Sequence, residues 1–137
     1  MYLDANVFMY AMADLSPWSA VAQGILAACE RGLCSATTSE LTLAECLVRP
    51  LQLRDERAIA AFRKSIQTRP QLVVLPVARE ILVEAARVRA TSAAKLPDAI
   101  HIASYRAQKC SVLVTNDRRL GATAGVNCVL VSDLIVD

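Results

Sequence analysis

Four acidic side chains of the 137-residue chain, Asp4, Glu45, Asp98 and Asp117, lie in places that packing alone does not explain. Asp4 and Asp117 follow short apolar runs that are typical of buried strands. Ligands of open parallel sheets bind beyond the carboxyl ends of the strands, so both aspartates are expected at one edge of a sheet. Each could instead cap the turn or helix that follows it, which is a common role of aspartate.

Glu40 and Glu45 fall on one predicted helix that begins near Thr38. Five residues at about 100° each place the two carboxylates about 140° apart, so only one of them can face a given cleft. Glu40 is three residues after Thr37, which is the spacing of a capping box. This local role would account for Glu40 without any catalytic function.

Glu45 projects from a largely apolar helix surface that includes Leu41 and Val48. A carboxylate in such a place requires a partner or a metal ion. An ion pair with Arg49 one turn later, or a second capping box with Thr42, would also account for it. The residues themselves leave these alternatives open.

Asp98 follows Pro97 in the nearly apolar segment 96–103, and the proline predicts the start of a helix. The helix dipole stabilises an anion in the first turn, whether its role is structural or functional. His101 lies one turn later and could be a metal ligand. A single histidine between Ile100 and Ile102 is more often a hydrogen-bonded packing residue, and we expect that role here.

The four acids come from well-separated segments that a parallel sheet would bring to one edge. Clustered carboxylates raise one another's pKa unless a cation neutralises them. Oxygen ligands select hard ions such as Mg²⁺ or Mn²⁺, which bind substrate phosphates and can activate a water for phosphodiester hydrolysis. The chain contains neither a Walker loop nor a GxGxxG motif, so nucleotide-cofactor chemistry is not indicated.

The elements that must position these acids form an α/β pattern. Short apolar runs rich in branched residues alternate with segments of helical period, which favours buried strands joined by helical crossovers. The predicted strands are 2–4, 33–36, 72–75, 112–114 and 126–131. The predicted helices are 17–31, the one that begins near Thr38, 55–69, 78–90 and 97–109. We therefore expect one domain, 1–137, with a mostly parallel sheet.

Composition supports a single domain in a reducing compartment. The chain is 55% apolar and 20% charged, and no apolar run approaches the roughly 18 residues that span a bilayer. Its five cysteines are odd in number and none forms a CxxC pair, which favours reduced thiols. We expect a cytoplasmic protein that does not enter a membrane.

The net charge of +2 conceals an asymmetry. Residues 49–69 carry six basic and two acidic side chains, which gives +4 for this segment and −2 for the rest of the chain. A charge run is most often a solvated helix face. It could also contact RNA phosphates or an acidic partner protein.

Four segments of the chain together resemble the PIN domain family, and within it the VapC-type toxin ribonucleases of bacterial toxin–antitoxin pairs. The matching segments are residues 2–7 (YLDANV), 38–45 (TSELTLAE), 96–101 (LPDAIH) and 114–117 (VTND). Each segment is short, but their order and spacing make the combined match specific.

The resemblance implies a three-layer fold, with a central mostly parallel sheet of about four to five short strands flanked by helices. It also implies that the four acids (Asp4, Glu45, Asp98 and Asp117) form a Mg²⁺ or Mn²⁺ site, which Asn6, Thr115 and Asn116 help to hold. The implied activity is RNA cleavage by a homodimer that a cognate antitoxin silences.

Two other functions remain to be weighed against a metal-dependent ribonuclease. The chain could be a PIN-like module that has lost its chemistry and only binds RNA or a protein. It could also be a phosphohydrolase with an aspartate nucleophile at position 4. Such enzymes usually have a second aspartate two residues later, where this chain has Asn6. The chain therefore lacks one residue that this mechanism requires.

Overall fold

A sheet of five parallel strands forms the centre of the computed structural model, which describes residues 1–13, 15–123 and 125–135. In the order β3-β2-β1-β4-β5 across the sheet, the strands are β3 (Leu72–Leu75), β2 (Ala36–Ser39), β1 (Tyr2–Leu3), β4 (Leu113–Thr115) and β5 (Cys128–Leu130). The predicted α/β class and parallel sheet are confirmed. Because β1 lies in the centre between β2 and β4, the residue that follows it is well placed for a site at the sheet edge.

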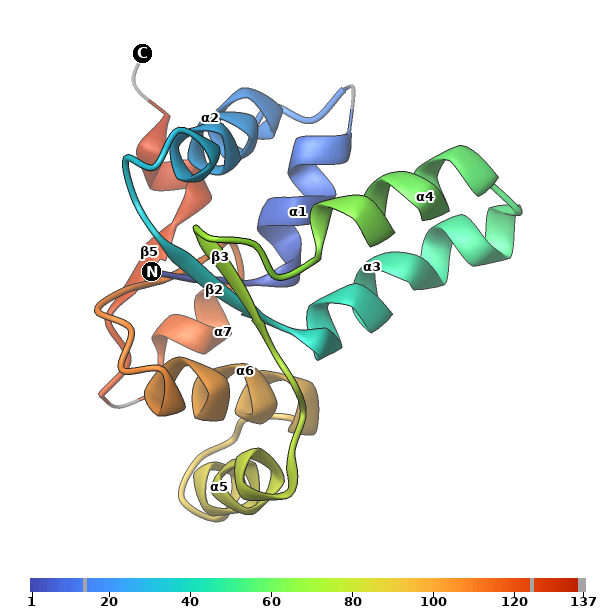
Figure 1. Cartoon of the computed structure of the whole chain (residues 1–137). Helices are drawn as coiled ribbons and strands as arrows, with labels where there is room; N and C mark the ends of the chain where they lie inside the picture. Colours follow the sequence, from blue (N-terminus) through green and yellow to red (C-terminus); the bar gives the residue numbers. More distant parts are fainter. Residues whose placement is uncertain (14, 124, 136–137) are drawn as a thin grey trace.

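Helices cover both faces of the sheet, which makes three layers (Figure 1). In chain order the described helices are α1 (Ala5–Met12), α2 (Ser19–Glu30), α3 (Glu40–Leu53), α4 (Glu56–Ser65), α5 (Arg79–Ala90), α6 (Leu96–Ala107), α7 (Arg118–Gly121) and the 3₁₀ helix η1 (Val131–Leu134). The sequence pattern does not predict the helix α1. It begins directly after β1, so Asp4 joins a strand to a helix.

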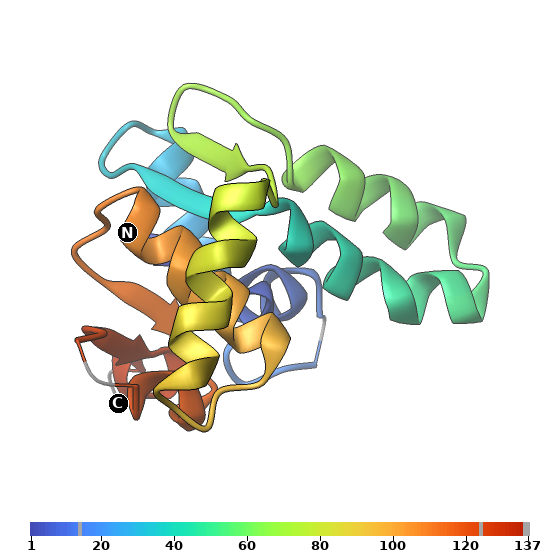
Figure 2. The ribbon, with the colours of Figure 1, turned by 90° about the horizontal axis from the view of Figure 1, so that it is seen from below.

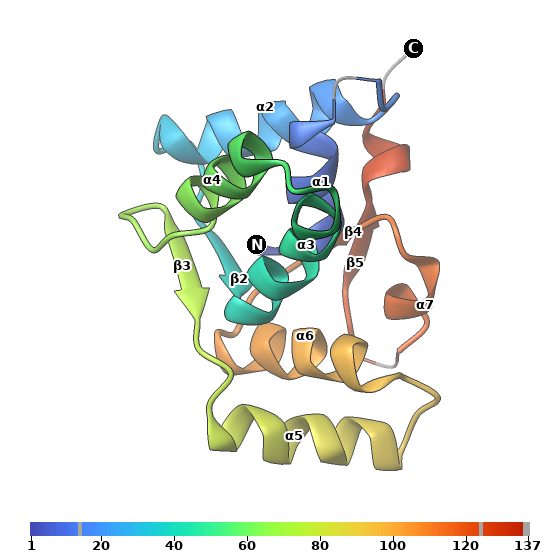
Figure 3. The same cartoon turned by 90° about the vertical axis from the view of Figure 1, so that its right-hand side faces the viewer.

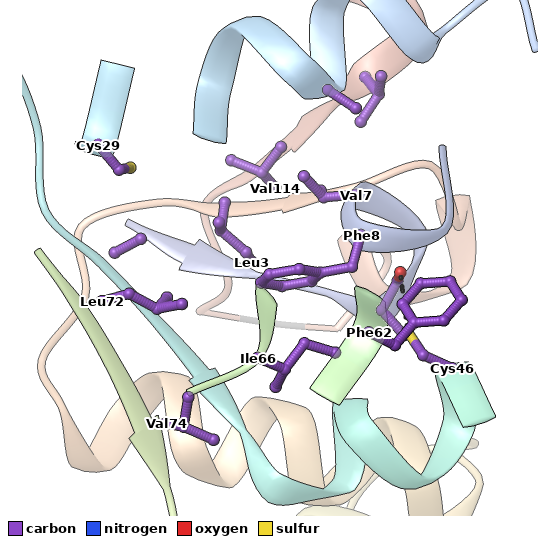
Figure 4. Packing of buried hydrophobic residues seen from close by; sticks show 14 residues of the cluster. Leu3, Val7, Phe8, Cys29, Cys46, Phe62, Ile66, Leu72, Val74 and Val114 are labelled. Carbon is purple, nitrogen blue, oxygen red and sulfur yellow. Dashed lines mark hydrogen bonds between the residues drawn. The ribbon is translucent and has the colours of Figure 1, made fainter. Parts of the chain in front are cut away.

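Successive residues of β1 point into two separate cores. Leu3 packs with Val7 and Phe8 of α1 and with other buried residues on that face of the sheet, and Figure 4 shows this cluster. Tyr2 packs on the other face, against Ala99 and other residues of α5 and α6. The central strand, although only two residues long, therefore contributes one fully buried side chain to each core.

The strand β2 begins three residues later than predicted, at Ala36 instead of Leu33. The end of α2 explains the difference, because Gly32 adopts a left-handed conformation (φ +72°) and the Leu33 amide bonds back to the Ala28 carbonyl. This closure leaves Leu33 72% exposed, in the turn and not in the sheet. The apolar character of Leu33 predicts a position in the strand, but the turn excludes it.

The glycine turn after α2 yields a stability prediction. Replacing Gly32 by Ala is expected to lower the free energy of unfolding by about 1 kcal/mol, because the added Cβ disfavours a left-handed backbone. Steric crowding is not the cause, since the nearest atom is Gln71 Nε2 at 3.9 Å.

The matched control for this turn is Gly24→Ala within α2. It should raise the free energy of unfolding by up to about 1 kcal/mol, because the position is helical and nothing lies within 4 Å of the added Cβ. Urea denaturation of both variants measures the two effects. If Gly32→Ala destabilised the protein no more than Gly24→Ala does, the left-handed backbone at Gly32 would not be the cause.

Helices α3 and α4 form an antiparallel arm, residues 40–65, that extends away from the sheet (Figures 1 and 2). Arg54 ends α3 with a left-handed backbone, and Asp55 then caps α4 by accepting from the Ala58 amide. The helix α4 ends at Ser65 and not near residue 69 as predicted. The basic side chains of segment 49–69 are exposed, except for half-buried Arg69, which donates to the Ser65 carbonyl.

All five cysteines are free thiols, as expected, with Cys29 and Cys46 buried and the other three partly buried. Burial raises the pKa of Cys46 to about 12, and the nearby charges of Glu45 and Asp4 act in the same direction. Among the described helices, none is both long and apolar enough to cross a bilayer.

Candidate metal centre

Asp4 lies at the carboxyl end of β1 and is 6% exposed. Its Oδ1 accepts from the Ala5 amide at 2.8 Å and so caps α1. Its Oδ2 accepts from Thr115 Oγ1 at 2.6 Å and from Asn6 Nδ2 at 3.1 Å. Capping and site formation, which the sequence left as alternatives, coincide at this residue. Three donors fix the carboxylate in a single orientation.

Glu45 reaches Asp4 through His101, which is buried and hydrogen-bonded as expected, but its partner is an acid of the predicted site. Nε2 of His101 is 2.6 Å from Oε1 of Glu45 and 3.4 Å from Oδ1 of Asp4. One ligand atom from each of these three residues lies within 4.8 Å of the other two, which is compact enough to hold a metal ion. The sequence signal was the i+3 spacing from Asp98, but it did not show which residue His101 would meet.

The ring of His101 is 1% exposed, and its other nitrogen, Nδ1, lies 2.7 Å from the Tyr2 hydroxyl. Burial lowers the pKa of His101, but the hydrogen bond to Glu45 and the charges of Asp4, Glu45 and Asp98 more than offset this, so the net shift is upward. Burial, with the charge of Asp4, raises the pKa of Tyr2 and keeps its hydroxyl neutral. Tyr2, His101 and Glu45 thus form a hydrogen-bonded row from β1 to α3.

The structure distinguishes Glu45 from Glu40. Glu45 pairs with His101 and not with Arg49, and it forms no capping box, because Thr42 Oγ1 accepts from Thr38 inside the core. Glu40 is exposed in the first turn of α3, away from this pair.

The predicted capping box between Thr37 and Glu40 is wrong. Thr37 belongs to β2, where its amide donates to the Met1 carbonyl, and α3 begins two residues later than expected. Ser39 caps the helix instead, by accepting from the Leu41 amide at 3.0 Å. The strand β2 is shifted by three residues along the chain, so it contains Thr37 and the helix begins after it.

Asp98 lies in the first turn of α6 and is half-buried. Burial raises its pKa, and the charges of Asp117 and Asp4 add to this, while Arg119 and His101 oppose it. The charges of Asp117 and Asp4 therefore act on Asp98, but Asp98 does not belong to the compact group that Asp4, Glu45 and His101 form. In Figures 1 and 3, α6 lies beside α7, with the beginning of α3 close to α6.

Asp117 follows β4 and caps α7 by accepting from the Arg119 amide at 2.9 Å. The Arg119 guanidinium also binds both carboxylate oxygens, with Nε 3.1 Å from Oδ1 and Nη2 2.8 Å from Oδ2. These contacts hold the pKa of Asp117 below its usual value, against the effect of burial. Asp117 therefore caps α7 and pairs with Arg119, and it lies outside the compact group of Asp4, Glu45 and His101.

Of the three predicted supporting residues, two contact the acids. Asn6 and Thr115 both bind Asp4, and Thr115 Oγ1 also accepts from the Asp117 amide at 3.0 Å. Asn116 points elsewhere: it donates to the Tyr10 hydroxyl at 3.3 Å and accepts from the Ser132 amide at 3.1 Å. Any support from Asn116 is therefore indirect, through the positions of α1 and η1.

The donor set fits a divalent cation. Asp4, Glu45 and His101 present ligand atoms close to one another, and burial and then the acidic neighbours raise the pKa of Asp98. A cation at this position would relieve that repulsion. The carboxylate oxygens are the ligands that hard ions prefer.

The fold and this cluster define an α/β protein with an acidic site at the carboxyl edge of a parallel sheet. The PIN domain family matches residues 1–126, so the chain belongs to that family. No curated protein sequence matches the chain.

Solved structures of toxins and toxin–antitoxin complexes share the fold. VapC20 of Mycobacterium tuberculosis, described as a toxin that cleaves the sarcin–ricin loop, has a TM-score of 0.73 and 16% identity over 90% of this chain and 94% of its own. VapBC of Salmonella typhimurium bound to DNA has a TM-score of 0.71 and 19% identity, over 95% and 96%. FitAcB of Neisseria gonorrhoeae has a TM-score of 0.71 and 16% identity, over 97% and 99%.

Proposed function

We propose that the chain is a Mg²⁺- or Mn²⁺-dependent endoribonuclease and the toxin of a VapBC-type toxin–antitoxin pair, acting in the cytoplasm. The observation that carries this proposal is the approach of Glu45 and His101 to Asp4 in a chain of the PIN domain family. Asp4, Glu45 and His101 come from three separate elements, and apolar packing does not account for their approach. We propose that Asp98 and Asp117, whose charges act on each other near α7, complete this site.

Asp4, Glu45, Asp98 and Asp117 would hold the ion, with His101 either as a further ligand or as a donor to Glu45. When bound, the ion would activate a water and stabilise the charge that develops on the scissile phosphate. Thr115 and Asn6 fix the Asp4 carboxylate so that it need not reorganise. The exposed basic side chains of segment 49–69 would contact flanking RNA phosphates.

An acidic antitoxin segment is the proposed protein partner. Several structural neighbours are complexes of a toxin with its antitoxin, and the arm of this chain offers exposed arginines for such a segment. We also propose a homodimer. Coexpression with the neighbouring reading frame tests the pairing: the partner should copurify and relieve a growth defect, whereas normal growth without it would contradict the toxin role.

The activity is tested by incubating structured RNA with the purified chain in Mg²⁺ or Mn²⁺ and in EDTA. Cleavage that requires the ion supports the proposal. Cleavage that continues in EDTA would contradict it. A chain that shifts RNA in a gel but never cuts it would favour a PIN-like binding module instead.

Glu45→Gln and Glu40→Gln form a matched pair for this assay. The first should reduce cleavage by about 10- to 100-fold, because it removes a charge next to His101 and Asp4. The second should leave the rate within about twofold, because exposed groups away from a site contribute little. The reverse order would show that the site uses the other glutamate.

A further inference from the structure

A cavity of about 500 Å³ that Asp98 helps to line lies between the α5–α6 connection and α7. Asp98 and Arg119 line it together with Lys95, and small residues form much of the remaining wall, including Ala93, Ala94 and Ala122. In Figure 3 this connection and α7 lie on the same side of the molecule. The volume is within the range of about 300–1,000 Å³ that is typical of small-ligand pockets.

Arg119 is held in place at this cavity. Its Nε and Nη2 bind the two oxygens of Asp117, which fixes the plane of the guanidinium although 67% of the side chain is exposed. A guanidinium has five N–H donors, and these two bonds use two of them. The remaining N–H groups suit the geometry of a phosphate.

Lys95 adds a second cation on the same wall. It is exposed immediately before α6 and lines the cavity together with Arg119. The one carboxylate that lines the cavity, Asp98, is a proposed metal ligand, so its charge would be neutralised when the ion is bound. Among the described lining residues, Lys95 and Arg119 are the two basic side chains, and Asp117, which pairs with Arg119, does not line the cavity.

We propose that this cavity binds one nucleotide of single-stranded RNA, with Arg119 and Lys95 on the phosphate next to the one that is cut. This inference rests on the proposed function, because it places the nucleotide beside the metal centre. A cavity of this size admits one unstacked nucleotide and excludes a base-paired one. The site would therefore select unpaired loops or ends.

The two arginines of α7 give a matched comparison. Arg118 is also exposed, but it lines a different cavity with residues such as Asn127 and Asp133. Arg118→Gln and Arg119→Gln change the net charge equally. Ala122→Leu provides a third variant, because it narrows the proposed cavity without altering any charge.

The test is an NMR titration of the full chain with a nucleoside 5′-monophosphate in Mg²⁺. We expect amide shifts at residues 91–95 and 119–123. Arg119→Gln should weaken binding about tenfold, as expected for loss of a charged hydrogen bond, and Lys95→Gln should weaken it less. Arg118→Gln should stay within twofold of wild type. Ala122→Leu should weaken nucleotide binding while Mn²⁺ affinity is retained.

Two other ligands show whether the amide shifts come from the nucleotide as a whole, from its phosphate alone or from any acidic ligand. Inorganic phosphate should compete weakly, and a hexaglutamate peptide should not shift these amides. Equal effects of the Arg118 and Arg119 variants, or equal binding of the peptide, would overturn the subsite. RNA cleavage is measured separately, so an active enzyme without nucleotide shifts would overturn only the subsite. Nucleotide binding without any cleavage would instead contradict the proposed function.

Discussion

Replacing Asp4 by Asn is expected to reduce RNA cleavage by about 100-fold or more. Asp4 is the most buried acid of the cluster, and its two oxygens accept from Ala5, Thr115 and Asn6. An asparagine amide would direct N–H groups at one set of these donors and would carry no charge for a cation. The variant should fold, because it also removes repulsion among the acids.

The control for this experiment is Asp133→Asn, the same chemical change at an exposed acid of η1. It should cleave RNA at the wild-type rate, and both variants should show far-ultraviolet circular dichroism spectra like that of the wild type. Equal cleavage by Asp4→Asn and Asp133→Asn would show that the reaction does not depend on the carboxylate at position 4.

Replacing His101 by Leu is expected to lower the free energy of unfolding by about 3 kcal/mol. The side chains are similar in size, so the cost comes from lost hydrogen bonds and not from a cavity. Tyr2 is 0% exposed, and its hydroxyl would lose the hydrogen bond to His101. Glu45 would lose its hydrogen bond to the imidazole of His101. Urea denaturation in EDTA measures this effect without a contribution from metal binding.

Tyr2→Phe separates the two halves of the row of hydrogen bonds. It removes the hydrogen bond between the Tyr2 hydroxyl and His101 Nδ1, leaves the bond between His101 and Glu45 in place, and should cost about 1–2 kcal/mol, less than His101→Leu. If His101→Leu changed stability by less than about 0.5 kcal/mol, His101 would not hold the strand and helix together.

The class of fold and the edge at which acids collect could be predicted because both follow from local patterns. Short branched runs such as Leu72–Leu75 form strands wherever both faces are covered. Asp4 and Asp117 each follow one of two neighbouring strands, β1 and β4, so a parallel arrangement is enough to bring them together. No knowledge of side-chain contacts was needed for either prediction.

The features that could not be predicted depend on backbone closure or on tertiary partners. The left-handed Gly32 delayed β2, and this shift moved the helix start past Thr37 and removed the expected capping box. Glu45 had several reasonable local partners, but its actual partner, His101, is 56 residues away. A histidine between isoleucines looks apolar in sequence, although one face of its helix meets the acids.

The most direct test of the metal centre is a titration with Mn²⁺ followed by electron paramagnetic resonance. The wild-type chain should remove free Mn²⁺ from solution in a saturable way, and Mg²⁺ should release it. Asp4→Asn and Glu45→Gln should weaken this binding strongly, whereas Glu40→Gln and Asp133→Asn should not change it. If Mn²⁺ remained free with the wild-type chain, or bound equally well to Asp4→Asn, the proposed site would be contradicted.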